Sequence, residues 1–406
     1  MRTQRRVIGH LHIHTRAKFV ESDGDGLRQC SESIRSGKLV AFPTETVFGL
    51  GANAEDETAV RSIFAAKARP HTDPLIVHVL GKERMHDLFD FGNQEGTDSA
   101  SQAKSVCEVL CDAFWPGPLT LVYKASSKIP SLITANTGFV GLRSPRHPIA
   151  RELLAICDPI AIAAPSANRF GHVSPTTANH VMDDLGATED LLILRAPQSE
   201  ASSNTDCDVG IESTVCSVSP SGDKVTILRC GAVGAQAIRR ALSQEQISAE
   251  VVVNNQKNAD TGSDDDSSGA VVAPGQLLKH YAPDVTTYVV SARTLQALRD
   301  GHEAAAPLAE IVDGGASILD FAQSLVDLRG DGDERFYRDL SPSGNVEEAC
   351  KMLFMTLREA EEAQKTLLIP DLQSIYLEDN SDSKRRNDLL MALVERLVRA
   401  SSGKRI

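Results

Sequence analysis

The sequence predicts an α/β protein with two domains. Short apolar runs of strand length alternate with segments in which apolar residues recur at helical spacing. A chain of 406 residues is long enough to bury two hydrophobic cores. The polar segment 254–270, which contains three consecutive aspartates, separates the two alternating patterns. We therefore expect a larger α/β domain before this segment and a smaller one after it.

The composition is that of an ordinary globular protein, with 41% hydrophobic and 24% charged residues. No apolar run approaches the roughly 20 residues that a membrane-spanning helix needs. The formal net charge of −13 argues against a surface that grips nucleic acid by its phosphates. A small anion held by a few local cations is the expected ligand. The eight cysteines contain no Cys-x-x-Cys pair, so we expect reduced thiols in an intracellular protein and no zinc site.

The N-terminal segment 1–26 is expected to be a leader outside the folded domain. Its basic residues precede the first acidic one, Glu21, and are Arg2, Arg5, Arg6, Arg16 and Lys18. His10, His12 and His14 alternate along it. Three interpretations stay open: a disordered leader, a mitochondrial targeting segment and a metal-binding tract. A cytoplasmic location is expected, with the mitochondrion as the alternative.

The stretch from residue 38 to residue 80 carries most of the readable chemistry. An apolar run at 39–42 stops at Pro43, which indicates a buried strand followed by a turn. Asp56 then opens a helix with an apolar stripe, and Pro70 forces the chain out of it. A second buried strand is expected at 75–80.

Lys67 and Arg69 close the helix that begins at Asp56. Two cations suit the negative end of a helix, which is one explanation of their position. The other explanation is that they hold a polyphosphate, since an arginine can grip phosphate with two parallel hydrogen bonds. Spacing alone leaves both explanations open.

The rest of the first domain continues the alternation. Helices are expected at 30–37, 85–91 and 104–114, and strands at 119–123, 140–144, 159–164, 191–195, 208–215 and 225–231. The second domain is expected to contain a strand at 286–291, helices at 293–300, 346–364 and 387–402, and an extended piece at 369–376.

Several sequence words occur in order along the first domain. They are PTETVFGLG at 43–51, KARP at 67–70, PLIVH at 74–78, WPGPLT at 115–120, GIESTV at 210–215 and ILRCG at 227–231. Together they resemble the threonylcarbamoyl-AMP synthases, the YrdC-like family. The segment 273–283, APGQLLKHYAP, is similar to the linker of the long two-domain form, which crosses the active site of the first domain.

The resemblance implies a fold with a twisted mixed sheet and flanking helices, plus a smaller C-terminal Rossmann-like α/β domain. The implied boundaries are 27–245 for the catalytic domain, 246–284 for the linker and 285–406 for the accessory domain. It implies a nucleotidyltransferase that joins L-threonine, bicarbonate and ATP into threonylcarbamoyl-AMP and pyrophosphate for the t6A37 modification of tRNA. Mg²⁺ is expected on the phosphates of ATP and on no protein site. The expected partner is the transferase machinery that passes the product to tRNA, and contact with tRNA or double-stranded RNA is a further possibility.

The resemblance also implies the site residues. Catalysis falls to Lys67 and Arg69, and threonine or carbamate contacts to Thr46, His78, Thr120 and Arg143. ATP contacts fall to Lys67, Arg69, Asp73, Ser144, Ser166, Asn168, Ser174, Ser213, Arg229 and Tyr281, and His280 is expected to face ligand beside Tyr281. Asp73 stands where the family often has Asn, and a carboxylate there is expected to repel phosphate. From its spacing alone, His78 is a core residue on a buried strand, and only the resemblance makes it a substrate contact.

Two other functions compete with this one. Hydrogenase maturation proteins that form carbamoyl-adenylate contain a similar domain, but they also carry zinc-finger Cys-x-x-Cys pairs that this sequence lacks. A non-catalytic module that binds double-stranded RNA is the second alternative. Such a module spreads cations over about 16 base pairs, and the acidic composition of this chain disfavours it.

Overall fold

The computed structural model describes residues 16–92, 98–196, 206–254, 281–329, 335–376 and 387–406. Residues 1–15 of the expected leader lie outside these ranges. The same holds for residues 255–280 of the expected linker, including His280. In the described ranges, no helix has the length and apolar character that crossing a membrane requires.

The first domain is organised around a mixed sheet of eleven strands, in the order β1-β8-β2-β3-β7-β4-β6-β5-β9-β10-β11. The strands are β1 (Lys18–Glu21), β2 (Val40–Phe42), β3 (Gly49–Asn53), β4 (Ile76–His78), β5 (Leu119–Lys124), β6 (Phe139–Arg143), β7 (Ile162–Ala163), β8 (Leu192–Arg195), β9 (Thr214–Val218), β10 (Lys224–Arg229) and β11 (Glu250–Val253). Parallel pairs such as β4 with β6 stand beside antiparallel pairs such as β5 with β6. The mixed sheet that the resemblance implied is therefore confirmed.

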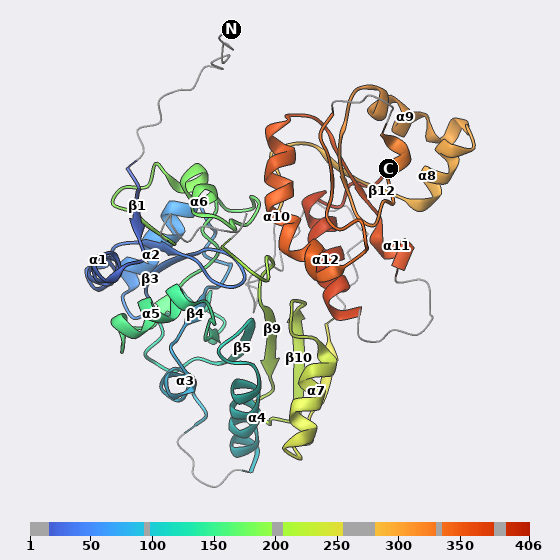
Figure 1. The fold of residues 1–406 in the computed structure, drawn as a ribbon. Coiled ribbons are helices and arrows are strands. Elements are labelled where there is room, and N and C mark those ends of the chain that lie inside the picture. Colours follow the sequence, from blue (N-terminus) through green and yellow to red (C-terminus); the bar gives the residue numbers. More distant parts are fainter. Residues whose placement is uncertain (1–15, 93–97, 197–205, 255–280, 330–334, 377–386) are drawn as a thin grey trace.

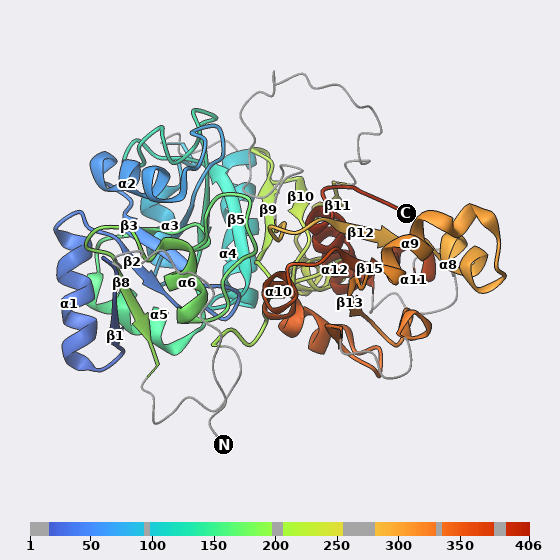
Figure 2. The same ribbon diagram turned by 90° about the horizontal axis from the view of Figure 1, so that it is seen from above.

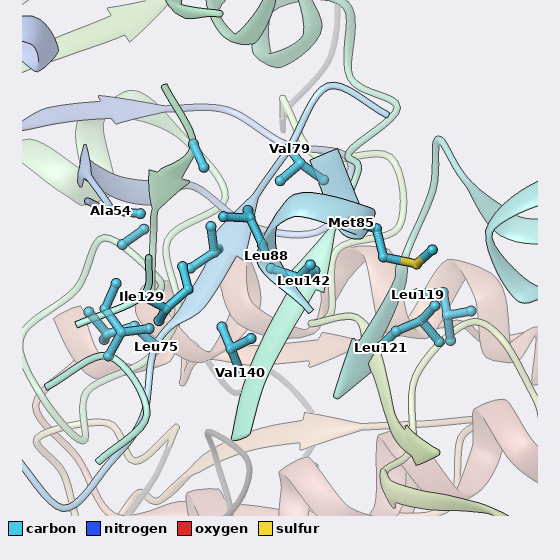
Figure 3. Packing of buried hydrophobic residues seen from close by; sticks show 14 of the residues in the cluster. Ala54, Leu75, Val79, Met85, Leu88, Leu119, Leu121, Ile129, Val140 and Leu142 are labelled. Carbon is cyan, nitrogen blue, oxygen red and sulfur yellow. The ribbon is translucent and has the colours of Figure 1, made fainter. Parts of the chain in front are cut away.

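Helices cover both faces of this sheet. They are α1 (Gly24–Arg35), α2 (Glu57–Lys67), α3 (Lys82–Leu88), α4 (Asp98–Phe114), α5 (Pro148–Cys157), α6 (Ala178–Leu185) and α7 (Ala235–Gln244). The helix expected after Asp56 is confirmed, because the Asp56 side chain accepts hydrogen bonds from the first backbone N–H groups of α2. α1 and α5 share one apolar cluster with β2 and β8, while α2, α3, α4 and α7 pack into the larger cluster. Figure 3 shows Met85 and Leu88 of α3 in this larger cluster, beside Leu121 and Leu142 of the sheet.

Some boundaries differ from the expectation. β1 lies inside the expected leader and pairs with β8, so the folded domain begins before residue 27. Its four residues, KFVE, are too short and too charged at their ends to stand out as a strand. β11 lies inside the expected linker and pairs with β10. Neither α5 nor α6 was expected.

The second domain contains four parallel strands in the order β12-β15-β13-β14. These are β12 (Thr287–Val290), β13 (Ser317–Asp320), β14 (Tyr337–Asp339) and β15 (Leu367–Pro370). Its helices are α8 (Ala292–Arg299), α9 (Ala306–Asp313), α10 (Val346–Glu362), α11 (Leu372–Tyr376) and α12 (Asn387–Ala400). The expected small α/β domain is confirmed. The prediction of an extended piece at 369–376 is wrong for its later residues, because Leu372–Tyr376 form α11.

The two domains share a continuous apolar core. Figures 1 and 2 show α10 and α12 on the side of the second domain that faces the first, with α8 and α9 farther away. The core around α10 and α12 includes four residues that belong to the first domain or to the end of the expected linker: Val47, Val173, Ile211 and Tyr281. The two domains come close at Gly210, where an added Cβ would lie 2.4 Å from the Cα of Lys351 in α10. Only glycine fits this position, which also has a φ of +74°.

Buried charges add a polar contact between the domains. Arg358 of α10 pairs with Asp184 at 2.8 Å and donates a hydrogen bond to the backbone carbonyl of Val173. His172 lies between two carboxylates, Asp184 at 2.9 Å and Glu361 of α10 at 3.0 Å. Its imidazole therefore bridges the first domain and α10.

The eight cysteines are free thiols, as expected, and seven of them are buried. Cys230 is half-buried.

The bridge at His172 predicts a pH-dependent stability. Burial lowers the pKa of His172, but hydrogen bonds to Asp184 and Glu361 outweigh burial, so the pKa is raised above its usual value. The stabilisation is then fully present below the unfolded pKa of about 6.5 and is lost as pH rises through the higher folded pKa. We expect His172→Asn to lower the free energy of unfolding more at about pH 6 than at about pH 9, because the protonated imidazole is lost as pH rises.

Urea unfolding followed by circular dichroism at both pH values measures this difference. His71→Asn, at an exposed position, is the control and should show little pH dependence. A destabilisation by His172→Asn that grows with pH would contradict the bridge.

Candidate active site

A cavity lies where the loops at one end of the strands of the first sheet meet the start of the second domain. Eight of the residues predicted from the sequence line it: Thr46, Arg69, His78, Arg143, Ser166, Ser213, Arg229 and Tyr281. They come from segments as far apart as the loop after β2 and the end of the expected linker. The structure thus brings together three of the four predicted cations, Arg69, Arg143 and Arg229, around one cavity.

Arg143, the last residue of β6, is tied to the loop after β2. Its guanidinium pairs with Glu45 at 2.7 Å and donates a hydrogen bond to the Thr46 hydroxyl at 2.8 Å. Both charged side chains are almost fully buried. Burial opposes ionisation of Glu45, but the charge and hydrogen bonding of Arg143 hold the pKa of this carboxyl below its usual value. The pair therefore fixes the position of the Thr46 hydroxyl at the cavity wall.

Arg69 leaves α2 through the left-handed residue Ala68 and turns into the cavity. It pairs with Asp73 at 2.9 Å and donates to the backbone carbonyls of Asp73 and Pro74. Asp73 is fully buried and lies outside the cavity lining. Asp73 was expected to repel phosphate, but its carboxylate faces Arg69, which balances its charge.

Lys67 does not line the cavity. Its ammonium group donates to the backbone carbonyls of Ser166 and Asn168, at 2.6 Å for Ser166. Burial, with the nearby charge of Arg69, lowers the pKa of Lys67 well below its usual value. Lys67 therefore supports the Ser166–Asn168 turn from behind, which neither sequence-based explanation anticipated. Direct phosphate contact by Lys67 stays a prediction.

Ser213 and Arg229 form a second polar wall. Arg229 ends β10 and donates to both the backbone carbonyl and the hydroxyl of Ser213, at 3.0 and 3.1 Å. Thr120 hydrogen-bonds the same hydroxyl at 2.8 Å, and Ser174 donates to Glu212 at 2.6 Å. Thr120 and Ser174 therefore stand one hydrogen bond behind the cavity lining.

Ser144 and Asn168 also lie behind the lining. The Ser144 hydroxyl donates to the backbone carbonyl of Leu80 at 2.9 Å. The Asn168 amide donates to the carbonyls of Arg169 and His172, both at 2.8 Å. These side chains shape the loops around the cavity and lie outside its lining, and their contacts with ATP stay a prediction.

His78, on β4, is buried but lines the cavity. Burial, together with the charge of Arg143, lowers the pKa of His78 to about 3, so the imidazole is neutral at physiological pH. Its Nδ1 has no hydrogen-bond partner among the residues that the structure describes. Because buried polar atoms are rarely left unpaired, this nitrogen indicates a place for a ligand donor. The position fits a substrate contact better than a satisfied core histidine.

Tyr281, in the expected linker, is the first described residue after 255–280, and it lines the cavity. Its backbone is left-handed, with a φ of 64°. The ring packs against Phe354 of α10, with centroids 5.5 Å apart, and the guanidinium of Arg396 lies 5.8 Å from the ring centre. The second domain therefore holds the residue that closes this side of the cavity.

Sequence reasoning missed three charged residues of the site: Glu45, Glu212 and Arg396. Glu45 and Glu212 stand inside the sequence words quoted above, but a carboxylate is not an obvious choice beside an anion. Arg396 lies on a leucine-rich helix more than 160 residues beyond the last of those words, and no local pattern marks it as buried. Only the tertiary structure brings it to the site.

Comparisons with known proteins agree with this architecture. A family model described as "Telomere recombination" matches residues 32–231, and one described as "Threonylcarbamoyl-AMP synthase, C-terminal domain" matches residues 235–402. The curated threonylcarbamoyl-AMP synthase of Pyrococcus abyssi is 34% identical over 332 residues, which cover 82% of this chain and 84% of that protein. The synthase of Schizosaccharomyces pombe is 33% identical over 289 residues, covering 68% and 66%.

A solved structure shows the same fold. The crystal structure of P. abyssi Sua5 complexed with L-threonine aligns with a TM-score of 0.71 and 31% sequence identity. The alignment covers 96% of this chain and 98% of that one, so it includes both domains.

The buried pair of Arg143 and Glu45 predicts a large loss of stability when it is broken. Glu45→Ala leaves the guanidinium of Arg143 buried without its counter-ion, and such losses are about 3–5 kcal/mol. Urea denaturation measures the free energy of unfolding. The control is Glu57→Ala, which breaks an exposed pair with Arg61 and should cost much less. Equal losses in the two variants would contradict the importance of the buried pair.

Proposed function

Because this chain belongs to the threonylcarbamoyl-AMP synthase family, we propose that it forms threonylcarbamoyl-AMP and pyrophosphate from L-threonine, bicarbonate and ATP. The observation that carries the proposal is the cavity in which Arg69, Arg143 and Arg229 converge beside the neutral imidazole of His78. A relative that shares both domains was solved with L-threonine, which supports threonine as the amino acid.

The proposed reaction requires no covalent bond between the protein and its substrates. The nitrogen of threonine joins bicarbonate to give a carbamate, with loss of water. A carbamate oxygen then attacks the α-phosphorus of ATP, a new P–O bond forms, and the bond from this phosphorus to the departing pyrophosphate breaks. The attacking oxygen is already an anion, so no covalent nucleophile is required. Positioning and charge compensation are what the site must supply.

The arginines supply the charge compensation. Among the described lining residues, three arginines stand against one carboxylate, Glu212. Asp73 and Glu45 pair with two of these arginines from outside the lining, so it is the guanidinium N–H groups more than a large net charge that favour an anion. Guanidinium groups suit phosphate oxygens because they present parallel N–H donors. Lys67 contributes indirectly in this proposal, by fixing the turn that carries Ser166.

His78 and Thr46 form the proposed amino-acid side of the cavity. The neutral imidazole accepts a hydrogen bond at Nδ1 from the amino or hydroxyl group of threonine. The Thr46 hydroxyl, oriented by Arg143, contacts the carbamate. These contacts hold the carbamate oxygen close to the α-phosphorus.

Mg²⁺ enters, in this proposal, on the phosphates of ATP. The described lining offers one carboxylate, Glu212, which already accepts from Ser174 and pairs with Arg396. The described lining therefore presents no dedicated metal ligand, whereas Mg²⁺ commonly keeps several waters and binds substrate phosphates. When bound, the ion compensates the phosphate charge.

The product is a reactive mixed anhydride that water destroys. We place its use in the threonylcarbamoylation of tRNA, by a transferase that receives it from this enzyme. Tyr281, which closes the side of the cavity nearest the second domain, helps to keep water out.

Turnover of the purified chain tests the proposal. Incubation with ATP, bicarbonate and labelled threonine should give a labelled acyl-adenylate and release pyrophosphate only when threonine is present. Chromatography of the labelled product and a pyrophosphate assay measure the two events. Pyrophosphate release that ignores threonine, or salt-sensitive RNA binding without turnover, would overturn the assignment.

Substitutions on the two sides of the cavity should affect different affinities, one side that for ATP and the other that for threonine. Arg69→Gln should weaken ATP binding by roughly 2 kcal/mol, the size of a lost hydrogen bond to a charged group, and should spare threonine. His78→Phe should weaken threonine binding and spare ATP. Calorimetric titration of each variant measures both affinities.

Arg69→Gln with Asp73→Asn serves as the control. It removes the carboxylate that the single variant leaves unbalanced. A full recovery of ATP affinity in this double variant would show that Arg69 only neutralises Asp73 and does not bind phosphate.

A further inference from the structure

Arg396 of α12 is a fully buried arginine that joins the second domain to the cavity. Its Nε lies 3.1 Å from a carboxylate oxygen of Glu212, and its Nη1 donates to the backbone carbonyl of Cys230 at 2.8 Å. Its guanidinium also lies 5.8 Å from the ring centre of Tyr281. Two of these three partners, Glu212 and Tyr281, line the cavity.

Glu212 poses an electrostatic problem for an anion site. It is buried, it lines the cavity, and its other oxygen accepts from Ser174. Burial opposes its ionisation, but the positive charges of Arg396 and Arg229 hold its pKa below the usual value, so the carboxylate is charged. An uncompensated negative charge in this position would repel the phosphates of ATP strongly, because little water screens it.

We propose that Arg396 is a positioning residue of the nucleotide site, whose charge cancels that of Glu212 and whose guanidinium holds Tyr281 against the cavity. The inference rests on the proposed function, since it takes ATP to be the anion. It assigns the second domain a direct part in the site: ATP binding depends on α12 being docked. The contacts of Arg396 lie on the Ser213 and Arg229 side, so threonine binding near His78 should depend on it much less.

A matched residue distinguishes this role from ordinary domain docking. Arg358 of α10 is also a buried arginine that pairs across the interface, with Asp184 at 2.8 Å. Its partners, Asp184 and the carbonyl of Val173, do not line the cavity. Loss of either arginine weakens the interface, but only loss of Arg396 exposes ATP to an unbalanced carboxylate.

The experiment compares four variants of the full chain: Arg396→Gln, Glu212→Gln, the double variant of both, and Arg358→Gln. Calorimetry gives the Kd for ATP and for threonine, and circular dichroism with urea checks that each variant is folded. Arg396→Gln should raise the Kd for ATP at least about tenfold, equivalent to 1.4 kcal/mol, and change that for threonine much less. The double variant should regain most of the ATP affinity because the repelling carboxylate is gone. Arg358→Gln should bind ATP nearly as the wild type does.

Three results would overturn the inference. They are an unchanged ATP affinity in Arg396→Gln, no recovery in the double variant, and an equal loss in Arg358→Gln. If Arg396→Gln does not fold, Arg396→Lys takes its place. This variant keeps the positive charge beside Glu212, so it should retain most of the ATP affinity of the wild type. A folded Lys variant that binds no ATP overturns the proposal as well. Because these readouts are affinities, they are separate from turnover. A wild-type chain that binds ATP but makes no acyl-adenylate contradicts the proposed function. The comparison of the Arg396 variants would still test whether Arg396 supports ATP binding.

Discussion

The burial of arginine side chains next to carboxylates is the constraint on which the cavity depends. Removing a guanidinium from water costs several kcal/mol, so each one needs a close partner of opposite charge and acceptors for its remaining N–H groups. Arg69, Arg143 and Arg396 each have a buried carboxylate between 2.7 and 3.1 Å away. Each pair also joins two separate segments or tightens one turn. The arrangement therefore fixes the loops before a ligand arrives, which is how a site can stabilise charge without reorganising.

Much of the first domain could be predicted from the sequence, because its strands are short apolar runs and α2 has a clear cap at Asp56. The sequence words also identified residues that do meet at one cavity, such as Arg143 and Arg229. What could not be predicted was the direction of each side chain. Lys67 and Arg69 are two residues apart at a helix end, yet one supports a turn from behind and the other enters the cavity. The left-handed residue Ala68 between them ends α2 and changes the direction of the chain, and the helix propensity of alanine does not predict this.

The second domain acts as part of the site's scaffold as well as a separate fold. Val47 and Tyr281 line the cavity and also belong to the apolar core around α10 and α12. Without the second domain, Val47, Val173 and Ile211 would be exposed to water in a cluster. A residue such as Arg396 was beyond sequence reasoning for the same reason: its surroundings come from three segments that lie far apart along the chain.

The free thiols give this interface a built-in chemical reporter. Cys350 is buried in the core of α10, and the half-buried Cys230 supplies a carbonyl to Arg396. Burial raises the pKa of Cys350 to about 12 and that of Cys230 to about 11, so few thiolates form while the domains stay together. The alkylation rate of the buried Cys350 in the native protein would therefore report how often α10 separates from the first domain.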